Sequence, residues 1–327
     1  MRKLGETIMS RQSKEKLIGF YRQMVLIRRT EEKLMEVFST GEILGFLHVS
    51  IGQEAAPVGI CAHLRDDDYI GTTHRGHGYA IAKGIDLKRA MAELFGKKQG
   101  FCMGRSGSMH LADMSKGIMG ANGIVGGGIP IVTGAAFAAK YNGADQVAVA
   151  TFGDGAANQG TFHESLNIAA VMNLPVVFLC ENNGWAEFSP RLTHTKIDNI
   201  ADRATAYGMP GIIVGNNVLE IYEAAGESVA RARKGEGPTL IEVKCDRWYG
   251  HYVGDAQKYR GKEKIDTAMA QDCIKDYERF LLNERLLRKR EIEKIEAEIK
   301  SELEEAVNYA RNCPFPDPSE IMDGLYV

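Results

Sequence analysis

The chain has 327 residues, 44% of them hydrophobic and 25% charged, and its formal net charge at pH 7 is −3. This composition is typical of a globular protein with a large core, and the weakly negative charge argues against a surface for nucleic acid or an anionic membrane. No apolar run approaches the roughly 18 residues of a membrane span, and no signal-peptide pattern is found, so we expect a cytoplasmic protein. The six cysteines form no CxxC pair, which favours reduced thiols over a disulfide framework or a zinc site.

The first elements are predicted to be an arm and two helices. Residues 1–13 are polar and are expected to form a loose arm. Apolar residues recur at three- and four-residue steps over 14–38, which predicts a helix. A turn over 45–52 leads into the second helix. His48 lies in this turn, where a histidine is either structural or close to a ligand.

A short strand predicted over 69–73 separates three acids from a group of basic side chains. A metal site is one interpretation of Asp66–Asp68, but three consecutive acids are more typical of a solvated turn. His74, Arg75 and His77 follow the strand. Such a group suits an anion, because arginine can bind a phosphate through two parallel hydrogen bonds. The alternative is a surface turn with an ion pair.

Residues 96–128 are rich in glycine, and they are either a flexible linker or an ordered loop whose backbone approaches a ligand. A structureless loop of this length inside a compact domain is uncommon unless it is functional. Gly120, Gly123 and Gly126 do not make the G-x-G-x-x-G pattern, and no clear strand precedes them, which disfavours a nicotinamide-dependent oxidoreductase. A helix of small residues is predicted over 131–141.

The motif that organises the chain lies between two apolar runs. The runs at 147–152 and 175–180 predict fully buried strands, and helical spacing over 161–172 predicts a helix between them. Gly153-Asp154-Gly155 follows the first strand and Asn182-Asn183 follows the second. Because the carboxyl ends of parallel strands bind ligands in open α/β sheets, we expect both polar blocks to lie at a binding site.

The chemistry of these two blocks suits a metal ion and a phosphate. The Asp154 carboxylate and the Asn183 amide offer hard oxygen ligands, and Mg²⁺ prefers one or two of these together with phosphate oxygens. Glycines beside Asp154 allow close approach of the backbone, and the following helix N-terminus favours negative charge. Either block alone is equally consistent with an ordinary turn. Both blocks together, at the ends of consecutive buried strands, favour a metal–diphosphate site.

The rest of the chain continues the alternation of strands and helices. A strand over 211–215, a helix over 218–233 and a strand over 239–245 complete the prediction of an α/β fold with one doubly wound parallel sheet flanked by helices. A polar loop over 246–260 follows at the ligand-binding edge. On local sequence, its His251 is as consistent with a structural role as with a functional one.

The C-terminal part is charged and predicted to be helical, with helices at about 267–283 and 289–311 and an extended tail. We therefore divide the chain into an arm over 1–13, a ligand-binding α/β domain over 14–261, and a helical extension and tail over 262–327 that pack on the same domain.

The sequence resembles a known family. Gly153-Asp154-Gly155-Ala156-Ala157-Asn158-Gln159-Gly160, with Glu181-Asn182-Asn183, is similar to the thiamine diphosphate motif of one group of transketolase-like enzymes. That group is the α subunit of the thiamine-dependent first component of 2-oxo acid and acetoin dehydrogenase complexes. The resemblance runs from about Tyr21 to about Pro318. It implies a thiamine diphosphate-binding fold, with thiamine diphosphate and Mg²⁺ as cofactors.

The resemblance also implies roles for individual residues. His74 stands where the family has tyrosine, and Val125 matches the side chain that wedges the cofactor into its bent shape. The implied metal ligands are Asp154, Asn183 and the backbone carbonyl of Trp185. The implied catalytic residues are His251, His77 and His48. The implied cofactor-binding residues are Arg75, His74, Gly123, Val125, Asp154, Gly155, Ala156, Asn183 and His251.

Partners and substrate follow from the same resemblance. We find no second α/β domain in the sequence, so a β subunit is expected to supply the pyrimidine-binding domain and the glutamate that activates the cofactor, in an α2β2 heterotetramer. The acyl unit would pass to a lipoyl-bearing acyltransferase. The loop over 247–260 looks most like that of acetoin dehydrogenases; pyruvate or a branched-chain 2-oxo acid is the alternative substrate. A non-catalytic scaffold with the same fold is disfavoured, because Arg75, Asp154, Asn183 and His251 are all present.

Overall fold

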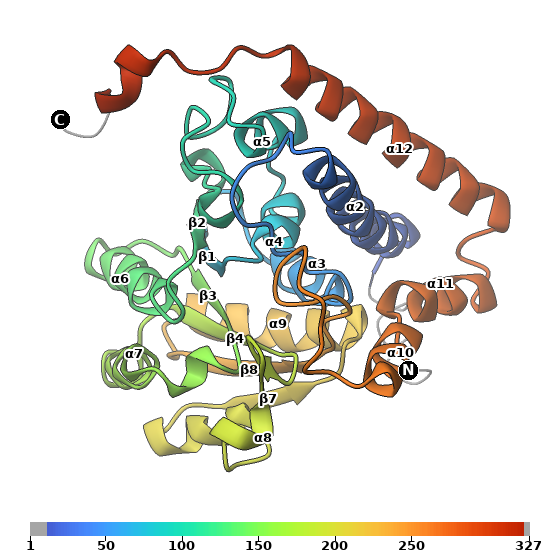
Figure 1. Cartoon of the computed structure of the whole chain (residues 1–327). Helices are drawn as coiled ribbons and strands as arrows, with labels where there is room; N and C mark the ends of the chain where they lie inside the picture. Colours follow the sequence, from blue (N-terminus) through green and yellow to red (C-terminus); the bar gives the residue numbers. More distant parts are fainter. Residues whose placement is uncertain (1–11, 324–327) are drawn as a thin grey trace.

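The computed structural model describes residues 12–323, so most of the predicted arm over 1–13 lies outside the described residues. The described chain is built on a six-stranded sheet in the order β2-β1-β3-β4-β8-β7, with every neighbouring pair parallel (Figure 1). Its strands are β1 (Tyr69–Thr73), β2 (Ile118–Asn122), β3 (Ala148–Gly153), β4 (Val176–Asn182), β7 (Gly211–Val214) and β8 (Thr239–Lys244). A small antiparallel hairpin pairs β5 (Trp185–Ala186) with β6 (Ser189–Pro190). The predicted doubly wound α/β fold is confirmed.

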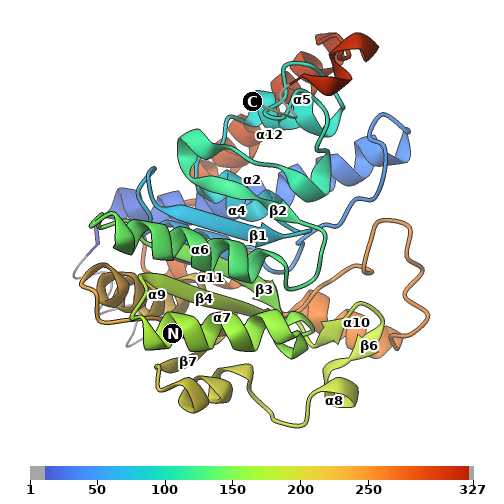
Figure 2. The same ribbon diagram turned by 90° about the vertical axis from the view of Figure 1, so that its left-hand side faces the viewer.

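Helices cover both faces of the sheet. Their bounds are α2 (Lys14–Ser39), α3 (Ala55–Cys61), α4 (His77–Ala82), α5 (Leu87–Leu94), α6 (Gly128–Tyr141), α7 (Gly160–Val171), α8 (Arg191–His194), α9 (Val218–Arg233), α10 (Lys262–Ala270), α11 (Cys273–Asn283) and α12 (Lys289–Asn312). The 3-10 helices are η1 (Ser108–His110), η2 (Met114–Lys116), η3 (Ala156–Asn158), η4 (Ile200–Tyr207) and η5 (Pro318–Met322). Figure 2 looks onto the face covered by α6 and α7, with α9 on the other side.

Alternation along the strands divides the core into two clusters. On β3, Val149 belongs to the cluster beneath α2, α3 and α9, whereas Ala150 belongs to the cluster beneath α6 and α7. Successive side chains of a strand point to opposite faces, so a strand covered on both sides must be apolar throughout. This requirement explains the unbroken apolar runs of β3 and β4, which form the centre of the sheet.

The C-terminal helices complete one of these clusters. Ile299 and Leu303 of α12 are buried in the same cluster as Leu34 of α2. Helix α12 lies along α2 and α5 (Figure 1).

Among residues 12–323, no helix combines the length and the apolar character needed to cross a bilayer.

Three sequence predictions need correction. The segment 96–128 contains a strand, β2, which pairs with β1 at the edge of the sheet, so a strand does precede Gly123. The helix predicted over 267–283 is two helices, because the Asp272 side chain accepts a hydrogen bond from the Ile274 N–H and starts α11 anew. In the predicted solvated turn, Asp68 is fully buried and binds Arg233 at 2.7 Å, which makes it a structural anchor.

Candidate active site

A cavity of about 320 Å³ opens at the carboxyl ends of the central strands. Its wall comes from the ends of β1, β2, β3 and β4, from the start of α6, and from the loop after β8. The predicted site residues that line it are His74, Arg75, Val125, Gly155, Ala156, Asn183, Trp185 and His251. The chain thus brings together, at the sheet edge, side chains that lie far apart in the sequence.

Asp154 lies at the end of β3 and is completely buried. Neither of its carboxylate oxygens has a hydrogen-bond partner within residues 12–323, and burial raises its pKa to about 6. Leaving a buried carboxylate unpaired is costly, so a ligand that supplies positive charge would be favoured here. The next residue must be small, because a Cβ on Gly155 would lie 2.7 Å from the Cβ of Ala186. The site therefore fits a cation held between β3 and the β5 turn.

Asn183 is positioned by a chain of buried amides. Its Oδ1 accepts from the Trp185 N–H at 3.2 Å, and its Nδ2 donates to Gln53 Oε1 at 3.1 Å. Gln53 Nε2 donates in turn to Glu181 Oε1 at 3.2 Å. Burial raises the pKa of Glu181 to about 7. An amide oxygen has two lone pairs, so Asn183 Oδ1 can still serve a metal.

Two buried arginines give the cavity a positive wall. Arg75 Nη1 donates to the Val49 carbonyl at 2.7 Å, and Nη2 donates to the His251 carbonyl at 2.6 Å. Arg247 also lines the cavity and donates to the Tyr259 hydroxyl at 3.0 Å. Burial, reinforced by the charge of Arg247, lowers the pKa of Arg75 to about 9, so it stays charged at neutral pH. Both guanidinium groups suit an anion.

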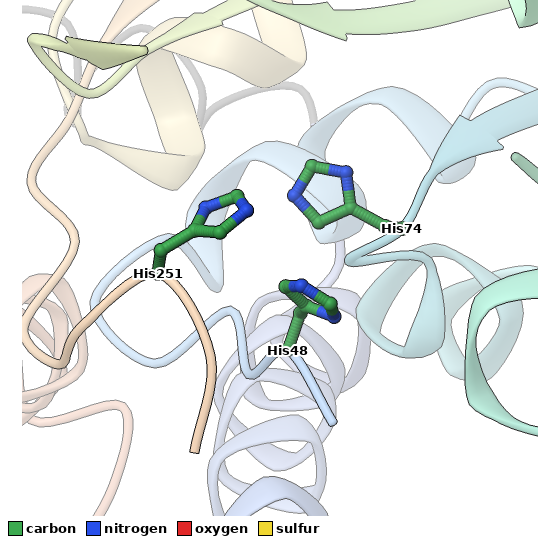
Figure 3. Close-up of side chains that lie close together, drawn as sticks. All are labelled: His48, His74 and His251. Atoms are coloured by element: carbon green, nitrogen blue, oxygen red, sulfur yellow. The ribbon is translucent and has the colours of Figure 1, made fainter. Parts of the chain in front are cut away.

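His48, His74 and His251 come from three separate segments and face one another (Figure 3). The His48 ring lies 4.7 Å from that of His74 and 4.9 Å from that of His251. Burial and the nearby charge of Arg75 lower the pKa of all three imidazoles, to about 3 for His48 and about 4 for His251. They are therefore neutral at pH 7. His74 and His251 line the cavity, whereas His48 is buried and does not line it.

Pairing of two backbone segments places these histidines. The Trp248 N–H donates to the Ile51 carbonyl at 3.2 Å, and the Val253 N–H donates to the Leu47 carbonyl at 2.8 Å. Gly52, at φ +98°, allows this approach, because a Cβ there would collide with the Asp246 carbonyl oxygen. The turn that carries His48 is thereby fixed against the loop that carries His251.

A charged network under the same turn connects it to the helices. Arg28 of α2 forms an ion pair with Glu54 and lies 3.4 Å from Asp272, the residue that caps α11. Its guanidinium also lies over the Trp248 ring, 4.1 Å from the ring centroid. Glu54 accepts from the Gly52 N–H at 3.0 Å. One buried arginine thus contacts the turn, the loop after β8 and the C-terminal helices.

His77 lies outside the cavity wall. Its Nδ1 lies 3.0 Å from Glu31 Oε2, and its Nε2 lies 2.9 Å from the Ser108 hydroxyl. Both ring nitrogens are therefore engaged by the protein. Glu31 also accepts from the Ser50 N–H at 3.1 Å. His77 thus joins α2, α4 and η1 and supports the turn that contains His48.

The glycine-rich segment is an ordered loop. The Glu93 carboxylate is buried and accepts hydrogen bonds from the backbone N–H groups of Cys102, Gly104 and Ser106 at 2.8–2.9 Å. Further along, Val125 lines the cavity and is half exposed, whereas Gly123 does not line it. The cavity is therefore open to solvent beside Val125.

Several buried polar residues in or near the site are not predicted by the sequence motifs. Gln53, Glu93 and Arg247 are buried polar residues outside any recognisable motif. Arg247 follows a strand at the ligand-binding edge, and that position alone could have indicated it. A lone Gln53, two residues before α3, gives no comparable signal.

The sheet is doubly wound and parallel. Its carboxyl edge carries a buried carboxylate without a partner, a hydrogen-bonded amide and two buried arginines. These features are typical of cofactor-dependent α/β enzymes. The sequence model of the family described as "Dehydrogenase E1 component" matches residues 22–319, and the chain belongs to this family. Enzymes of the family depend on thiamine diphosphate. The predicted resemblance is confirmed.

Relatives resemble the chain over nearly its whole length. The α subunit of acetoin:2,6-dichlorophenolindophenol oxidoreductase from Bacillus subtilis is 49% identical over 96% of this chain and 95% of its own. The subunit of the same name from Cupriavidus necator is also 49% identical, with the same coverage. The chloroplastic pyruvate dehydrogenase E1 component subunit alpha-3 of Arabidopsis thaliana is 38% identical over 96% of this chain and 75% of its own. These relatives are named as α subunits, which implies a β subunit as partner.

Proposed function

We propose that this chain is the α subunit of a cytoplasmic, thiamine diphosphate- and Mg²⁺-dependent dehydrogenase that cleaves acetoin and passes the acetyl unit to a lipoyl-bearing acyltransferase. The observation that carries this proposal is the buried, unpaired carboxylate of Asp154, whose neighbours Gly153 and Gly155 line the same cavity as Arg75 and Arg247. A site with that charge pattern suits a divalent cation bridged to a diphosphate. The similarity to acetoin-oxidising relatives points the same way.

Each part of the site has an assignable role toward the cofactor. Asp154, the Asn183 Oδ1 and the Trp185 carbonyl would hold Mg²⁺. Arg75 and Arg247 would balance the charge of the diphosphate, and the backbone at Gly155 and Ala156 would approach it closely. Val125, His74 and His251 line another part of the wall and would contact the rings of the cofactor, and Gly123 lies just outside that wall. When bound, thiamine diphosphate supplies a nucleophilic carbon and an electron sink for cleaving a bond beside a carbonyl.

Neutral imidazoles support acetoin as the substrate. His48, His74 and His251 are uncharged at pH 7, so each can donate one hydrogen bond and accept another. A hydroxy ketone offers a hydroxyl and a carbonyl that match this pattern, whereas the carboxylate of a 2-oxo acid would favour charged donors. His251, on the cavity wall, is the residue that we assign to hold and transfer a proton there. His77 has a positioning role through Glu31 and Ser108.

A β subunit would complete the site. The cavity is open beside Val125, and Ile124 next to it is largely exposed. We propose that the pyrimidine-binding domain of the β subunit covers this opening and supplies the activating glutamate, in an α2β2 heterotetramer. The chain alone is then expected to be inactive.

Two alternatives concern the reaction. Oxidative decarboxylation of pyruvate or a branched-chain 2-oxo acid fits the same cofactor site, and the Arabidopsis relative is named as a pyruvate dehydrogenase subunit. A nicotinamide-dependent oxidoreductase is disfavoured, because the glycines after β2 still lack the G-x-G-x-x-G spacing that approaches a dinucleotide.

The test is dye reduction by the chain co-purified with its β subunit, with thiamine diphosphate and Mg²⁺ present. Acetoin and pyruvate are supplied in parallel, and His251→Gln serves as the site variant. We expect faster turnover of acetoin than of pyruvate, and a lower kcat for His251→Gln measured at saturating thiamine diphosphate. Faster turnover of pyruvate would contradict the assignment of acetoin as the substrate, but it would not affect the proposed cofactor site. No turnover of either would overturn the proposed activity.

A further inference from the structure

Three imidazoles converge on one point beside the cavity. His48 lies in the turn before α3, His74 follows β1, and His251 lies in the loop after β8 (Figure 3). One ring nitrogen from each lies within 4.8 Å of the other two. Segments 26 to 203 residues apart in the sequence supply these three groups, so their meeting is a product of the fold.

The cluster has unmet bonding capacity. His48 is buried, and its Nδ1 has no hydrogen-bond partner in the described part of the chain. Such an atom is costly to leave unpaired. At neutral pH the imidazoles are uncharged, which is the form that binds metals.

We propose that His48, His74 and His251 form a binding site for a divalent transition-metal ion of the Zn²⁺ type, separate from the oxygen-lined Mg²⁺ site at Asp154. Three imidazoles and one open position are one of the known ligand sets of zinc sites that keep a position free for water or substrate. Imidazole nitrogen favours Zn²⁺, Co²⁺ or Cu²⁺, whereas carboxylate and amide oxygens favour Mg²⁺. The two sites therefore select different ions by ligand chemistry.

To bind a zinc ion, the three imidazole nitrogens must move closer together. Zn–N bonds of about 2.0–2.1 Å in a tetrahedral site place the nitrogens roughly 3.3 Å apart, compared with the 4.8 Å limit observed here. Turning the rings about their Cβ–Cγ bonds can bring the nitrogens inward. The Arg75 Nη2 lies 3.3 Å from His251 Nδ1, which leaves Nε2 of that ring for the metal. The positive charges of Arg75 and Arg247 oppose a cation, so we expect moderate affinity.

Occupancy of this site would affect the cavity directly. His74 and His251 line the cavity, so an ion held by them would present its open position there. The bound metal would take the imidazoles out of proton transfer, and Zn²⁺ is expected to inhibit the enzyme reversibly. This inference goes beyond the proposed function, because metal binding by the cluster does not require that acetoin be the substrate.

The test uses Co²⁺ as a spectroscopic probe, added to the cofactor-free complex of the full chain with its β subunit. A nitrogen-rich tetrahedral Co²⁺ site absorbs visible light strongly, whereas six-coordinate Co²⁺ at oxygen ligands absorbs weakly. We expect one strongly absorbing Co²⁺ for each chain, displaced by Zn²⁺. His74→Gln and His48→Gln should each weaken it by at least about tenfold, since even losing a residue that only orients a ligand weakens metal sites about that much.

Asp154→Asn is the matched control, because it alters the oxygen site and leaves the histidines in place. The strong absorption should persist in this variant. If Co²⁺ bound with the same spectrum and affinity in both histidine variants, or gave only weak absorption in the unsubstituted chain, the three-histidine site would be wrong. The two variants lie on different segments, so a folding defect in one leaves the other as the test. Failure of Asp154→Asn to affect thiamine diphosphate binding would instead count against the proposed function.

Discussion

The two sides of the cavity are built in different ways. On the strand side, Asp154 and Asn183 follow β3 and β4, whose parallel register pairs Gly153 with Glu181. On the loop side, Arg247 and His251 lie in a segment without regular structure and are held by hydrogen bonds from side chains to backbone carbonyls. Sheet pairing fixes the strand ends that carry the first set. A single substitution on the strand side should therefore change chemistry without moving the backbone, whereas one on the loop side should move several groups together.

The largest effect is expected from Asp154→Asn on the strand side. Affinity for thiamine diphosphate with Mg²⁺ should fall about a hundredfold, equivalent to roughly 3 kcal/mol, because a charged ligand is lost. Isothermal titration of the complex measures this. Asp66→Asn, the same change at an exposed acid, should leave the affinity as it is. Equal affinities in the two variants would mean that Asp154 does not hold the metal.

The same acid predicts how the stability of the cofactor-free complex depends on pH. Burial raises the pKa of Asp154 from 3.8 to about 6, so the folded state disfavours its charged form. The free energy of unfolding is therefore not reduced by this group below about pH 4. It decreases as the pH rises through 6, by on the order of 3 kcal/mol for this group. Thermal unfolding at pH 4.5 and 7 should show a smaller decline in Asp154→Asn than in the unsubstituted complex. An identical decline in both would contradict the assignment.

On the loop side, Arg247→Met should weaken cofactor binding by about tenfold and also lower the melting temperature. The buried side chain bridges the carbonyls of Glu187 and Tyr249 and the hydroxyl of Tyr259, and its removal breaks these three partly buried hydrogen bonds. Calorimetry gives both quantities. Arg279→Met, at an exposed site on α11, is the control for replacing an arginine. A loss of affinity without any loss of stability would show that the loop side is as rigid as the strand side.

The smallest effect is expected from Gln53→Leu, which tests whether residues of the strand side also depend on side-chain hydrogen bonds. Gln53→Leu removes the donor to Glu181 and the acceptor of Asn183, and it should cost about 1–2 kcal/mol of stability. The Mg²⁺ concentration that gives half-maximal activity should rise a few-fold, because the Asn183 side chain loses one of its two hydrogen-bond partners. Gln99→Leu is a control with the same change of residue. Unaltered Mg²⁺ dependence would show that the register of β4 alone is enough to place Asn183.

Strand-side residues were predictable because their signal is local. The runs before Asp154 and Asn182 are apolar throughout, and short polar blocks end them, which indicates both the element and its ligand-binding end. The bounds predicted for β1 and α9 agree with the structure for the same reason. By contrast, β2 is an edge strand of mixed burial with the sequence Ile-Met-Gly-Ala-Asn, so it lacks the apolar run that marks a central strand.

Loop-side placement depends on contacts between segments distant in sequence. The pairing of Val253 with Leu47, and of Trp248 with Ile51, brings His251 beside His48, and no periodicity in either segment indicates it. Burial of Asp68 was missed in the same way, because its partner Arg233 lies 165 residues further along the chain. Predictions for His48 and His251 rested on the family resemblance, which carries long-range information that local patterns lack.

The contacts of Arg28 have a consequence for how such a chain can evolve. This one residue joins the first helix, the turn of His48, the loop of His251 and the cap of α11. Its geometry therefore depends on residues from the first and the last quarter of the 327-residue sequence. Recombination that transferred only the sheet would carry Asp154 and Asn183 into a new setting, but would leave the histidines without the framework that brings them together.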